Sequence, residues 1–208
     1  MIVFLFVFFA KFSVLFSQNQ VGSLPGSIDV SPTGSATYSI PIEVVPGTQG
    51  IQPNLSIVYN SQSGNGALGL KWDISGLSAI TRSGQNKYHD NNITAIQFND
   101  NLDRFSLDGN RLIKTSNNGA YGSANSEYMT EIQTFTKTTI KLTADNKKYF
   151  EVEHDNGTIA EYGKTATSRL FSNNSAVWML NKITDVYGNY MTYIYETDNN
   201  YAKNVYST

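Results

Sequence analysis

Apolar and polar residues alternate along most of the chain after residue 34, which is the spacing of half-buried β-strands. Residues 36–44 and 55–59 form the first two such runs, and turn residues beginning at Pro46-Gly47 join them into a loose predicted hairpin. Proline has no amide proton to donate to a neighbouring strand. Pro41 therefore predicts that the first strand lies at a sheet edge, or that it pairs on one side only around residue 41.

A glycine-rich bend precedes the third alternating run. The segment Gly64–Gly69 matches the G-x-G-x-x-G spelling of a dinucleotide-binding loop, which requires a helix directly after it. Here Leu70, Trp72 and Ile74 alternate as a strand instead. We therefore interpret the glycines as a bend with left-handed backbone conformations, and we expect Trp72 to be buried in the strand beyond it.

Turn residues set the register of a hairpin over residues 104–114. A two-residue Asp108-Gly109 loop places Leu107 opposite Asn110. The next pair in that register is Phe105 with Leu112, so the three apolar side chains of this hairpin share one face.

A second hairpin is predicted over residues 149–163. A three-residue loop at 155–157, with Gly157 in the left-handed conformation, pairs Val152 with Ala160 and, two residues further, Phe150 with Tyr162. A third hairpin is expected over residues 176–195, with its turn at Gly188-Asn189.

These patterns predict an all-β fold in which antiparallel hairpins form a curved sheet or shell segment. No helix is expected after residue 20. Alternation assigns side chains to faces but does not decide whether the sheet closes on itself. The turns and strands on which this prediction rests are marked by Pro41, Gly47, Gly64, Gly66, Gly69, Trp72, Arg82, Gly109, Gly157 and Gly188.

The N-terminus indicates export. Ile2–Ala10 is apolar but too short to span a bilayer, which needs about 20 residues. We predict an N-terminal helical signal peptide over residues 1–17 with cleavage near Ser17, and hence a secreted protein with no stable membrane span after the leader is removed. Because no positive residue precedes the apolar run, a retained anchor is the alternative. Residues 18–34 are predicted to be a linker, and residues 35–208 a single β domain.

The amino-acid composition argues against nucleic-acid binding and against cysteine chemistry. Charged residues make up 15% of the chain and the net charge is −2, so no basic surface for nucleic acid is expected. The absence of cysteine excludes disulfides and thiol nucleophiles. The thirteen tyrosines are interpreted as packed and half-exposed faces of β-sheets.

Candidate catalytic and metal-binding residues are few. Glu151 and Glu153 have the Glu-x-Glu spacing of ADP-ribosyltransferases, but the companion Arg and Ser-Thr-Ser strand are not recognisable. Two glutamates on the outward face of a strand have the same spacing, and we prefer that interpretation. The only histidines, at positions 89 and 154, are interpreted as surface residues because a zinc site needs more ligands.

Asp100 and Asp103 offer oxygen ligands of the kind that calcium prefers. Their segment lacks the glycine and the terminal glutamate of an EF-hand, so we interpret it as a solvated Asx-rich turn. No G-x-S-x-G elbow of a serine hydrolase is present. We therefore predict no catalytic residue, no cofactor and no metal.

Short sequence motifs across residues 30–82 resemble the N-terminal domain shared by SpvB-like virulence proteins and the B component of insecticidal toxin complexes. The motifs are Ser31-Pro32-Thr33-Gly34, Ile40-Pro41-Ile42, Pro46-Gly47, Gln52-Pro53-Asn54-Leu55-Ser56, Tyr59-Asn60-Ser61, Gly64-Asn65-Gly66, Leu68-Gly69, Trp72 and the run from Ser75 to Arg82. The later motifs Arg104-Phe105, Leu107-Asp108-Gly109 and Trp178 to Glu196 resemble the rest of that domain, and the last of them also resembles the tyrosine-aspartate (YD) repeats of Rhs proteins.

The resemblance implies a structural module of a secreted shell. In such proteins this domain precedes YD repeats that coil around a C-terminal toxic or effector segment, and the ADP-ribosyltransferase of SpvB-like proteins lies in a separate C-terminal region. The expected partners are further Rhs/YD-repeat segments of the same polypeptide or other toxin-complex components. We interpret the chain as a fragment of a larger protein that ends in the first YD-like repeat. The alternative function is a secreted or cell-surface β-module that binds glycan or protein.

Overall fold

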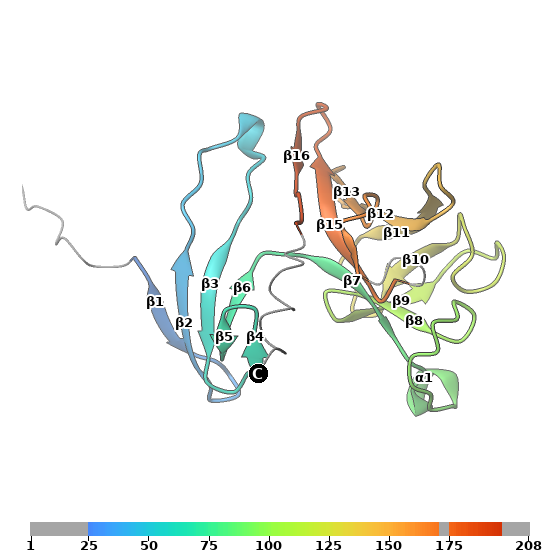
Figure 1. Cartoon of the computed structure of the whole chain (residues 1–208), viewed down its shortest axis with the longest axis horizontal. Helices are drawn as coiled ribbons and strands as arrows, with labels where there is room; N and C mark the ends of the chain where they lie inside the picture. The colour runs from blue at the N-terminus through green and yellow to red at the C-terminus, as the bar shows by residue number, and fades with distance from the viewer. Residues whose placement is uncertain (1–24, 171–174, 197–208) are drawn as a thin grey trace, which may run out of the picture.

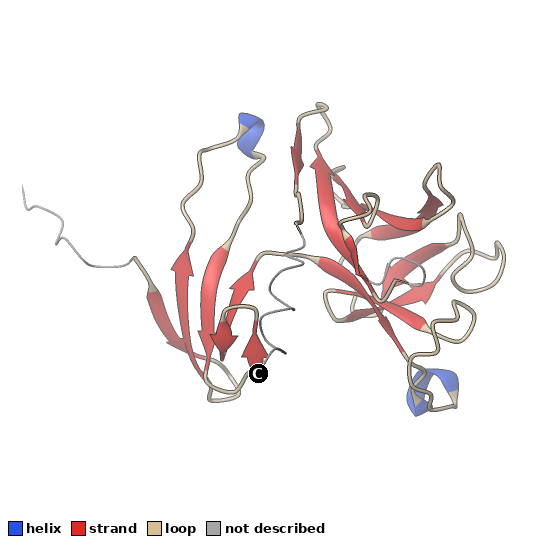
Figure 2. Cartoon of the chain, in the orientation of Figure 1, coloured by secondary structure: helices blue, strands red, loops and turns tan. Residues whose placement is uncertain are grey.

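The computed structural model describes residues 25–170 and 175–196, and these residues form antiparallel strands arranged in two main sheets (Figures 1 and 2). The all-β prediction is confirmed. The predicted signal peptide lies outside the described residues, whereas the YD-like segment from Trp178 to Glu196 lies within them. Among the described helices, none has the length and apolar character needed to cross a membrane.

Two short helical turns interrupt the strands. The 3-10 turn η1 (Thr48–Gly50) lies in a loop, and α1 (Lys87–Asp90) is a single α-helical turn. The Asn86 side chain caps α1 by accepting a hydrogen bond of 2.8 Å from the His89 amide. Apart from these two single turns, residues 25–170 and 175–196 contain no helix, in agreement with the all-β prediction.

The first sheet contains four strands in the order β1 (Ser27–Val30), β2 (Ala36–Pro41), β3 (Ser56–Asn60) and β6 (Trp72–Ser75). The predicted hairpin between β2 and β3 is confirmed. Strand β1 lies inside the predicted linker 18–34, so that boundary is wrong. In the segment Ser27–Val30, polar and apolar residues alternate as in a strand, and the turn from Ser31 to Ser35 lets this segment pair with β2.

Pro41 does not place its strand at the edge of the sheet, because β2 lies between β1 and β3. The pairing of β1 with β2 ends at Ser39, whereas Pro41 still pairs with Ser56 of β3. The missing amide proton therefore faces the side on which β1 has already ended. Of the two alternatives predicted from the proline, the edge strand is wrong and the one-sided pairing is confirmed.

The glycine-rich segment forms a small hairpin of β4 (Asn65–Gly66) and β5 (Gly69–Leu70). Lys71 then adopts the left-handed conformation with φ 66°, which separates Leu70 from the strand that begins at Trp72. Leu70 is 67% exposed and Trp72 is half-buried, so the predicted buried face through both residues is wrong. Gly66 is needed for close approach, since a Cβ atom there would lie 2.3 Å from the Trp72 carbonyl oxygen.

The second sheet closes into a barrel-like ring of eight strands. Closure occurs where the last strand of the ring pairs with an earlier one, placing Ala160 opposite Ile183. In ring order the strands are β7 (Ala79–Ser83), β8 (Arg104–Leu107), β9 (Asn110–Lys114), β10 (Glu127–Thr130), β11 (Lys137–Leu142), β12 (Lys148–Glu153), β13 (Ile159–Tyr162) and β15 (Val177–Thr184). Two short strands, β14 (Arg169–Leu170) and β16 (Tyr190–Thr192), pair with β15 outside the ring.

The turn chemistry predicted the local registers correctly. Leu107 pairs with Asn110 across the Asp108-Gly109 turn. Val152 pairs with Ala160 and Phe150 with Tyr162, as the three-residue loop requires. The turn before β16 likewise joins β15 to β16, with Ile183 opposite Met191.

The hydrophobic core fills the inside of the ring, and all its members come from the ring strands. Three aromatic side chains form its centre: Phe105, Phe150 and Trp178 are in mutual edge-to-face contact at centroid distances of 5.0 to 5.5 Å. The buried members are Ile80, Phe105, Leu107, Leu112, Tyr128, Ile140, Phe150, Val152, Ala160, Tyr162, Trp178 and Leu180. By contrast, the only buried residue among positions 25–79 is Ser35.

Candidate functional site

A buried arginine lies against the aromatic core of the ring. Arg82 points inward from β7, and its guanidinium carbon lies 5.3 Å from the centre of the Phe105 ring and 5.4 Å from that of Trp178. These distances allow favourable cation–π contacts with both rings. The guanidinium therefore packs as part of the core while keeping its charge.

Two aspartates and one carbonyl group satisfy this guanidinium. Nη1 donates to Asp103 Oδ2 at 3.0 Å, Nη2 donates to Asp100 Oδ1 at 2.7 Å, and Nε donates to the Ser175 carbonyl oxygen at 3.0 Å. Asp103 also accepts hydrogen bonds from the Gln97 and Asn99 amides. The buried charge is thus paired and hydrogen-bonded, which is the condition under which an ion pair is tolerated in a core.

The acidic segment forms the expected Asx turn, in which the Asn101 amide donates to Asn99 Oδ1 at 3.0 Å, but its carboxylates are not left to solvent. Asp103 is completely buried, and Asp100 contacts Lys148 in addition to Arg82. The carboxylates that suggested calcium are therefore neutralised by cations of the chain itself. Within residues 25–170 and 175–196, no group of three His, Asp or Glu side chains could hold a metal ion.

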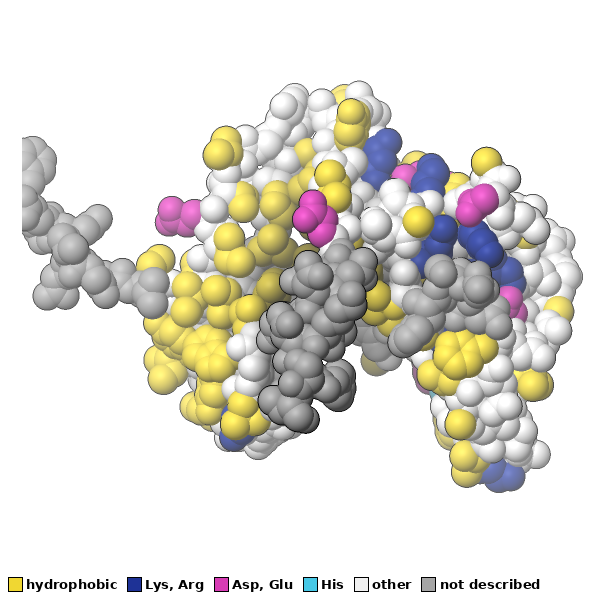
Figure 3. Space-filling model, in the orientation of Figure 1, with side chains coloured by type: hydrophobic (Ala, Val, Ile, Leu, Met, Phe, Trp, Pro, Cys, Tyr) yellow, Lys and Arg dark blue, Asp and Glu magenta, His cyan; other side chains and the backbone are white. Residues whose placement is uncertain are grey.

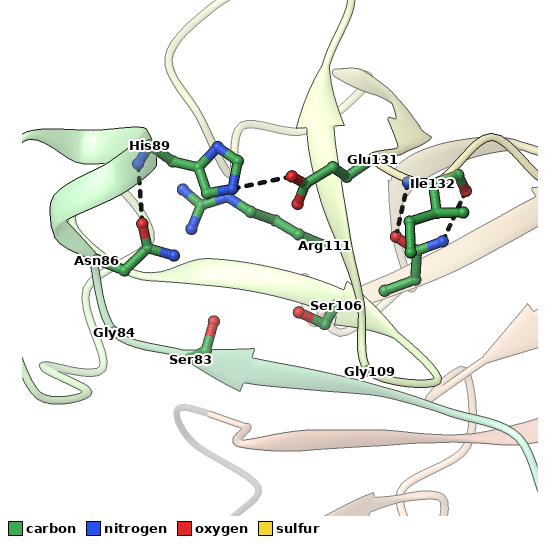
Figure 4. A pocket seen from close by; sticks show the side chains of 10 residues that line it. Ser83, Gly84, Asn86, His89, Ser106, Gly109, Arg111, Glu131 and Ile132 are labelled. Atoms are coloured by element: carbon green, nitrogen blue, oxygen red, sulfur yellow. Dashed lines mark hydrogen bonds and ion pairs between the residues drawn. The ribbon is translucent and has the colours of Figure 1, made fainter. Parts of the chain in front are cut away.

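A cleft of about 520 Å³ lies on the outer side of the ring (Figure 4). His89 of α1 and Glu131 after β10 approach each other across it, with His89 Nε2 3.0 Å from Glu131 Oε1. The Asn110 side chain makes reciprocal hydrogen bonds with the backbone of Ile132 at one side of the cleft. The cleft is lined by Ser83, Gly84, Asn86, His89, Ser106, Gly109, Asn110, Arg111, Glu131 and Ile132.

An ion-pair cluster beneath α1 holds this wall of the cleft in place. Asp90 lies 2.8 Å from Arg104 Nε and 2.8 Å from Arg111 Nη2. Burial acts to raise the pKa of Asp90, but hydrogen bonds from the Asn86 amide and from both arginines outweigh it and hold that pKa below its ordinary value. No local sequence pattern indicates this cluster, because only tertiary contacts bring Asp90 to strands β8 and β9.

The cleft does not contain the arrangement of a serine hydrolase. In such enzymes a serine hydroxyl is hydrogen-bonded to the histidine that takes its proton. Here the imidazole of His89 is paired with Glu131, and no serine hydroxyl of the described residues hydrogen bonds to it. The residues are arranged to link α1 to the β10–β11 loop.

The other residues considered from the sequence, Glu151, Glu153 and His154, lie on or beside strand β12. Glu151 and Glu153 lie on the outward face of β12, as expected, and Glu153 pairs with Lys137 of β11 at 3.1 Å. His154 is half-buried and lines a separate cavity of about 380 Å³. Burial lowers its pKa, so the interpretation of His154 as an ordinary surface residue is wrong.

The motif residues named from the sequence do not converge on one site. Gly47 and Gly188 line the same cavity of about 450 Å³, formed by the loop between β2 and β3 and the turn between β15 and β16. Gly109 and Gly157 lie in separate turns of the ring. Arg82 alone contacts a cluster of charged partners.

The fold is shared with components of bacterial toxins. The crystal structure of TcdB2-TccC3 aligns with a TM-score of 0.68 at 18% identity, covering 92% of this chain and 10% of that chain. The N-terminal domain of the effector protein SpvB from Salmonella typhimurium strain LT2 aligns with a TM-score of 0.62 at 24% identity, covering 77% of this chain and 54% of that chain. The described residues therefore share the β fold of these two structures.

The sequence comparison identifies the family. The family model described as SpvB, Salmonella virulence plasmid 65kDa B protein, matches residues 30–207, and the chain belongs to this family. The mono(ADP-ribosyl)transferase SpvB of Salmonella typhimurium is 26% identical over 190 residues, which cover 81% of this chain and 31% of that protein. The chain thus spans about a third of the length of this relative.

Proposed function

We propose that the chain is a non-catalytic structural module of a secreted, toxin-associated shell of the Rhs/YD-repeat type. In this proposal the shell encloses or delivers a C-terminal effector that this chain does not contain. Further YD-repeat segments of the same polypeptide, or other toxin-complex components, are the partners. Membership of the SpvB family and the fold shared with TcdB2-TccC3 support the proposal.

The observation that carries it is the way the sheet leaves the closed ring at β15. Residues 182–184 pair with β13 on one side and with β16 on the other, so β16 branches outward from the ring (Figure 1). Among the described strands, β16 pairs only with β15. Tyr187, Tyr190 and Ile194 beside it are exposed. A strand with one free edge can be extended by the next hairpin, as a repeat shell requires.

Hydrogen exchange tests this extension. In the 208-residue chain, we expect the β16 amides to exchange rapidly and the β8 amides inside the ring to exchange slowly. Addition of the YD-repeat segment that this proposal places after Thr208 should slow exchange in β16 and leave β8 unchanged. An unrelated downstream sequence, together with a monomeric chain whose β16 amides are already protected, would contradict the proposal.

The absence of catalysis has its own test. Glu151 and Glu153 face outward beside Lys137, in a strand rather than in a catalytic turn. We expect the chain to transfer no ADP-ribose when it is incubated with NAD and a protein acceptor. Transfer that is lost in a Glu153→Gln variant would show that this glutamate pair is catalytic.

Export is proposed from the leader. N-terminal sequencing of the protein recovered from a secreting host should begin near Gln18. Recovery of the intact N-terminus in the membrane fraction would support the retained anchor instead.

Binding of glycan or protein is the second candidate function. The cleft beside α1 and the exposed Tyr88 ring, which stacks edge-on against His89 at 4.7 Å, favour it. A glycan array distinguishes the two functions, because a shell module is expected to bind none of the glycans. Binding that is lost in Tyr88→Ala would favour the adhesive module.

A further inference from the structure

The dipeptide Asn-Gly occurs three times in the chain, at Asn65, Asn118 and Asn156. Asparagine is a chemically labile residue, and a following glycine favours its spontaneous deamidation. Glycine has no Cβ atom, so nothing hinders the attack of its backbone nitrogen on the amide carbon of the asparagine side chain. Because the dipeptide is the same at all three places, the surroundings of each one decide which reacts.

Two hydrogen bonds restrain Asn156. Its side-chain oxygen accepts from the Thr158 amide at 2.9 Å. The Gly157 amide, which holds the attacking nitrogen, donates to the His154 carbonyl oxygen at 2.9 Å. Both bonds have to break before the side chain can turn toward that nitrogen, so this site is expected to react slowly.

Strand pairing and close packing restrain Asn65. The residue lies in β4 and pairs with Leu70 of β5. The following Gly66 lies so close to β6 that an added Cβ atom would be 2.3 Å from the Trp72 carbonyl oxygen. The peptide unit between Asn65 and Gly66 therefore has little room to rotate, and this site is also expected to react slowly.

Asn118 differs from the other two sites. It lies with Gly119 in the loop between β9 and β10, and both residues are exposed. No hydrogen bond joins the Asn118 side chain or the Gly119 amide to another of the residues that the structure describes. An added Cβ atom at Gly119 would be 2.9 Å from the Ser123 hydroxyl oxygen, which can rotate away. The attack of the Gly119 nitrogen on the Asn118 side chain is thus unhindered.

The loop is anchored on either side of this dipeptide. The Ser116 hydroxyl oxygen accepts from the Glu127 amide at 3.0 Å, and the Tyr121 hydroxyl donates to the Leu112 carbonyl oxygen at 3.1 Å. The exposed segment between these anchors can therefore change its backbone conformation while the ring stays closed.

Deamidation would add a charge to a loop that has none. Residues 115–126 contain no charged side chain. Figure 3 shows hydrophobic side chains gathered over the four-stranded sheet, whereas the ring side of the same view is occupied mostly by uncharged polar side chains and backbone. A carboxylate at position 118 would be ionised at neutral pH.

We propose that Asn118 is a site of spontaneous deamidation in the folded protein. The Gly119 backbone nitrogen loses its proton and bonds to Cγ of Asn118, and the side-chain Nδ2 leaves as ammonia. Water then opens the succinimide ring at either carbonyl group, which yields aspartate or isoaspartate. Water is the only co-reactant, so the modification is independent of the proposed shell function.

Peptide mapping of the whole chain by mass spectrometry tests the site. Each conversion replaces NH₂ by OH and raises the mass of a peptide by about 1 Da. In the folded chain at mildly alkaline pH, we expect the Asn118 peptide to convert about tenfold faster than the Asn156 peptide, because no pair of hydrogen bonds has to break first. The Asn65 peptide should be as slow as the Asn156 peptide.

Two controls separate the fold from the dipeptide. In urea the three sites are equally unfolded, so their peptides should convert at similar rates. Asn118→Gln has a longer side chain that would have to close a larger ring. The more acidic species that ion exchange detects first in the ageing native chain should therefore be absent from this variant.

Three results would overturn the proposal. Conversion of Asn65 or Asn156 as fast as that of Asn118 in the folded chain would show that the restraints described above do not protect them. A lead of Asn118 that is equally large in urea would show that the fold does not select it. Persistence of the early acidic species in Asn118→Gln would place the modification elsewhere.

Discussion

Arg82 and Asp103 form a buried ion pair, with Arg82 Nη1 3.0 Å from Asp103 Oδ2 and the side chains 3% and 0% exposed. The two residues lie 21 positions apart, and their contact fastens the long loop after β7 onto one end of the closed ring. The segment that resembles toxin-associated domains most densely ends at this arginine. Arg82 places its charged guanidinium against the rings of Phe105 and Trp178, which belong to strands later in the chain.

Replacement of Asp103 by Asn should destabilise the fold by about 2–3 kcal/mol, because Arg82 loses one of its two carboxylate partners in the core and keeps only Asp100. In the wild-type chain the backbone N–H groups of Gln97 and Asn99 donate to the two carboxylate oxygens of Asp103. The asparagine side chain has only one acceptor oxygen and cannot satisfy both. Urea unfolding measures the loss. Asp29→Asn, on the exposed strand β1, is the control. Equal stability of the two variants would show that the pair is dispensable.

The two tryptophans should differ sharply. Trp178 is 2% exposed in the ring core, so Trp178→Ala is expected to cost about 3–5 kcal/mol. Trp72 is half-buried in the four-stranded sheet, so Trp72→Ala should cost roughly 1–2 kcal/mol and leave the ring folded. Fluorescence of the remaining tryptophan and circular dichroism follow both variants. Loss of all structure in Trp72→Ala would show that the two sheets fold as one unit.

Stability should fall between about pH 10 and pH 12, because burial raises the pKa of Tyr162 to about 12. The folded state keeps the Tyr162 proton at a pH near 10, where the unfolded state releases it. The contribution of neutral Tyr162 to the free energy of unfolding is therefore fully present below pH 10 and is lost as the pH rises through 12. The expected loss is about 2–3 kcal/mol. In Tyr162→Phe, the free energy of unfolding should fall less steeply with pH in this range, by the equivalent of about one bound proton. Tyr187→Phe, at an exposed position, is the control. An unchanged slope in Tyr162→Phe would exclude this residue as the cause.

Gly163 should tolerate a side chain far less than Gly188. Both have positive φ, at 71° and 85°, so alanine incurs backbone strain of about 1–2 kcal/mol at either position. A Cβ atom at Gly163 would also lie 2.2 Å from Trp178 Cδ1, whereas nothing lies within 4 Å at Gly188. We expect Gly163→Ala to lose at least about 1 kcal/mol more than Gly188→Ala in denaturant titrations. Equal losses would show that Trp178 moves aside without cost.

Local pattern was sufficient for the hairpins. The Asp108-Gly109 turn and the loop at 155–157 each specify how two adjacent strands meet, so the pairs Leu107–Asn110 and Val152–Ala160 followed from the sequence. Pattern reading failed where one residue changed the backbone direction. Lys71 in the left-handed conformation moved Leu70 off the strand of Trp72, and lysine carries no signal for that conformation.

The candidate site was only partly predictable. Arg82 stood out as the end of a dense motif, but nothing near it indicated its partners Asp103 and Ser175. The cluster around Asp90 depends on strands 14 and 21 residues away. Contacts of this kind arise when twisted strands return to one another, and no local spacing encodes them.

Closure of the ring was decided by the tertiary structure. Alternation from Trp178 and Leu180 would turn Ile183 outward, and only a register shift in the pairing of β13 with β15 places it opposite Ala160. That pairing depends on the accumulated twist of eight strands and on the volume of the aromatic core that they enclose. Strand faces and turns are encoded over a few neighbouring residues, whereas the partners of a strand across the molecule are chosen by how the whole sheet packs.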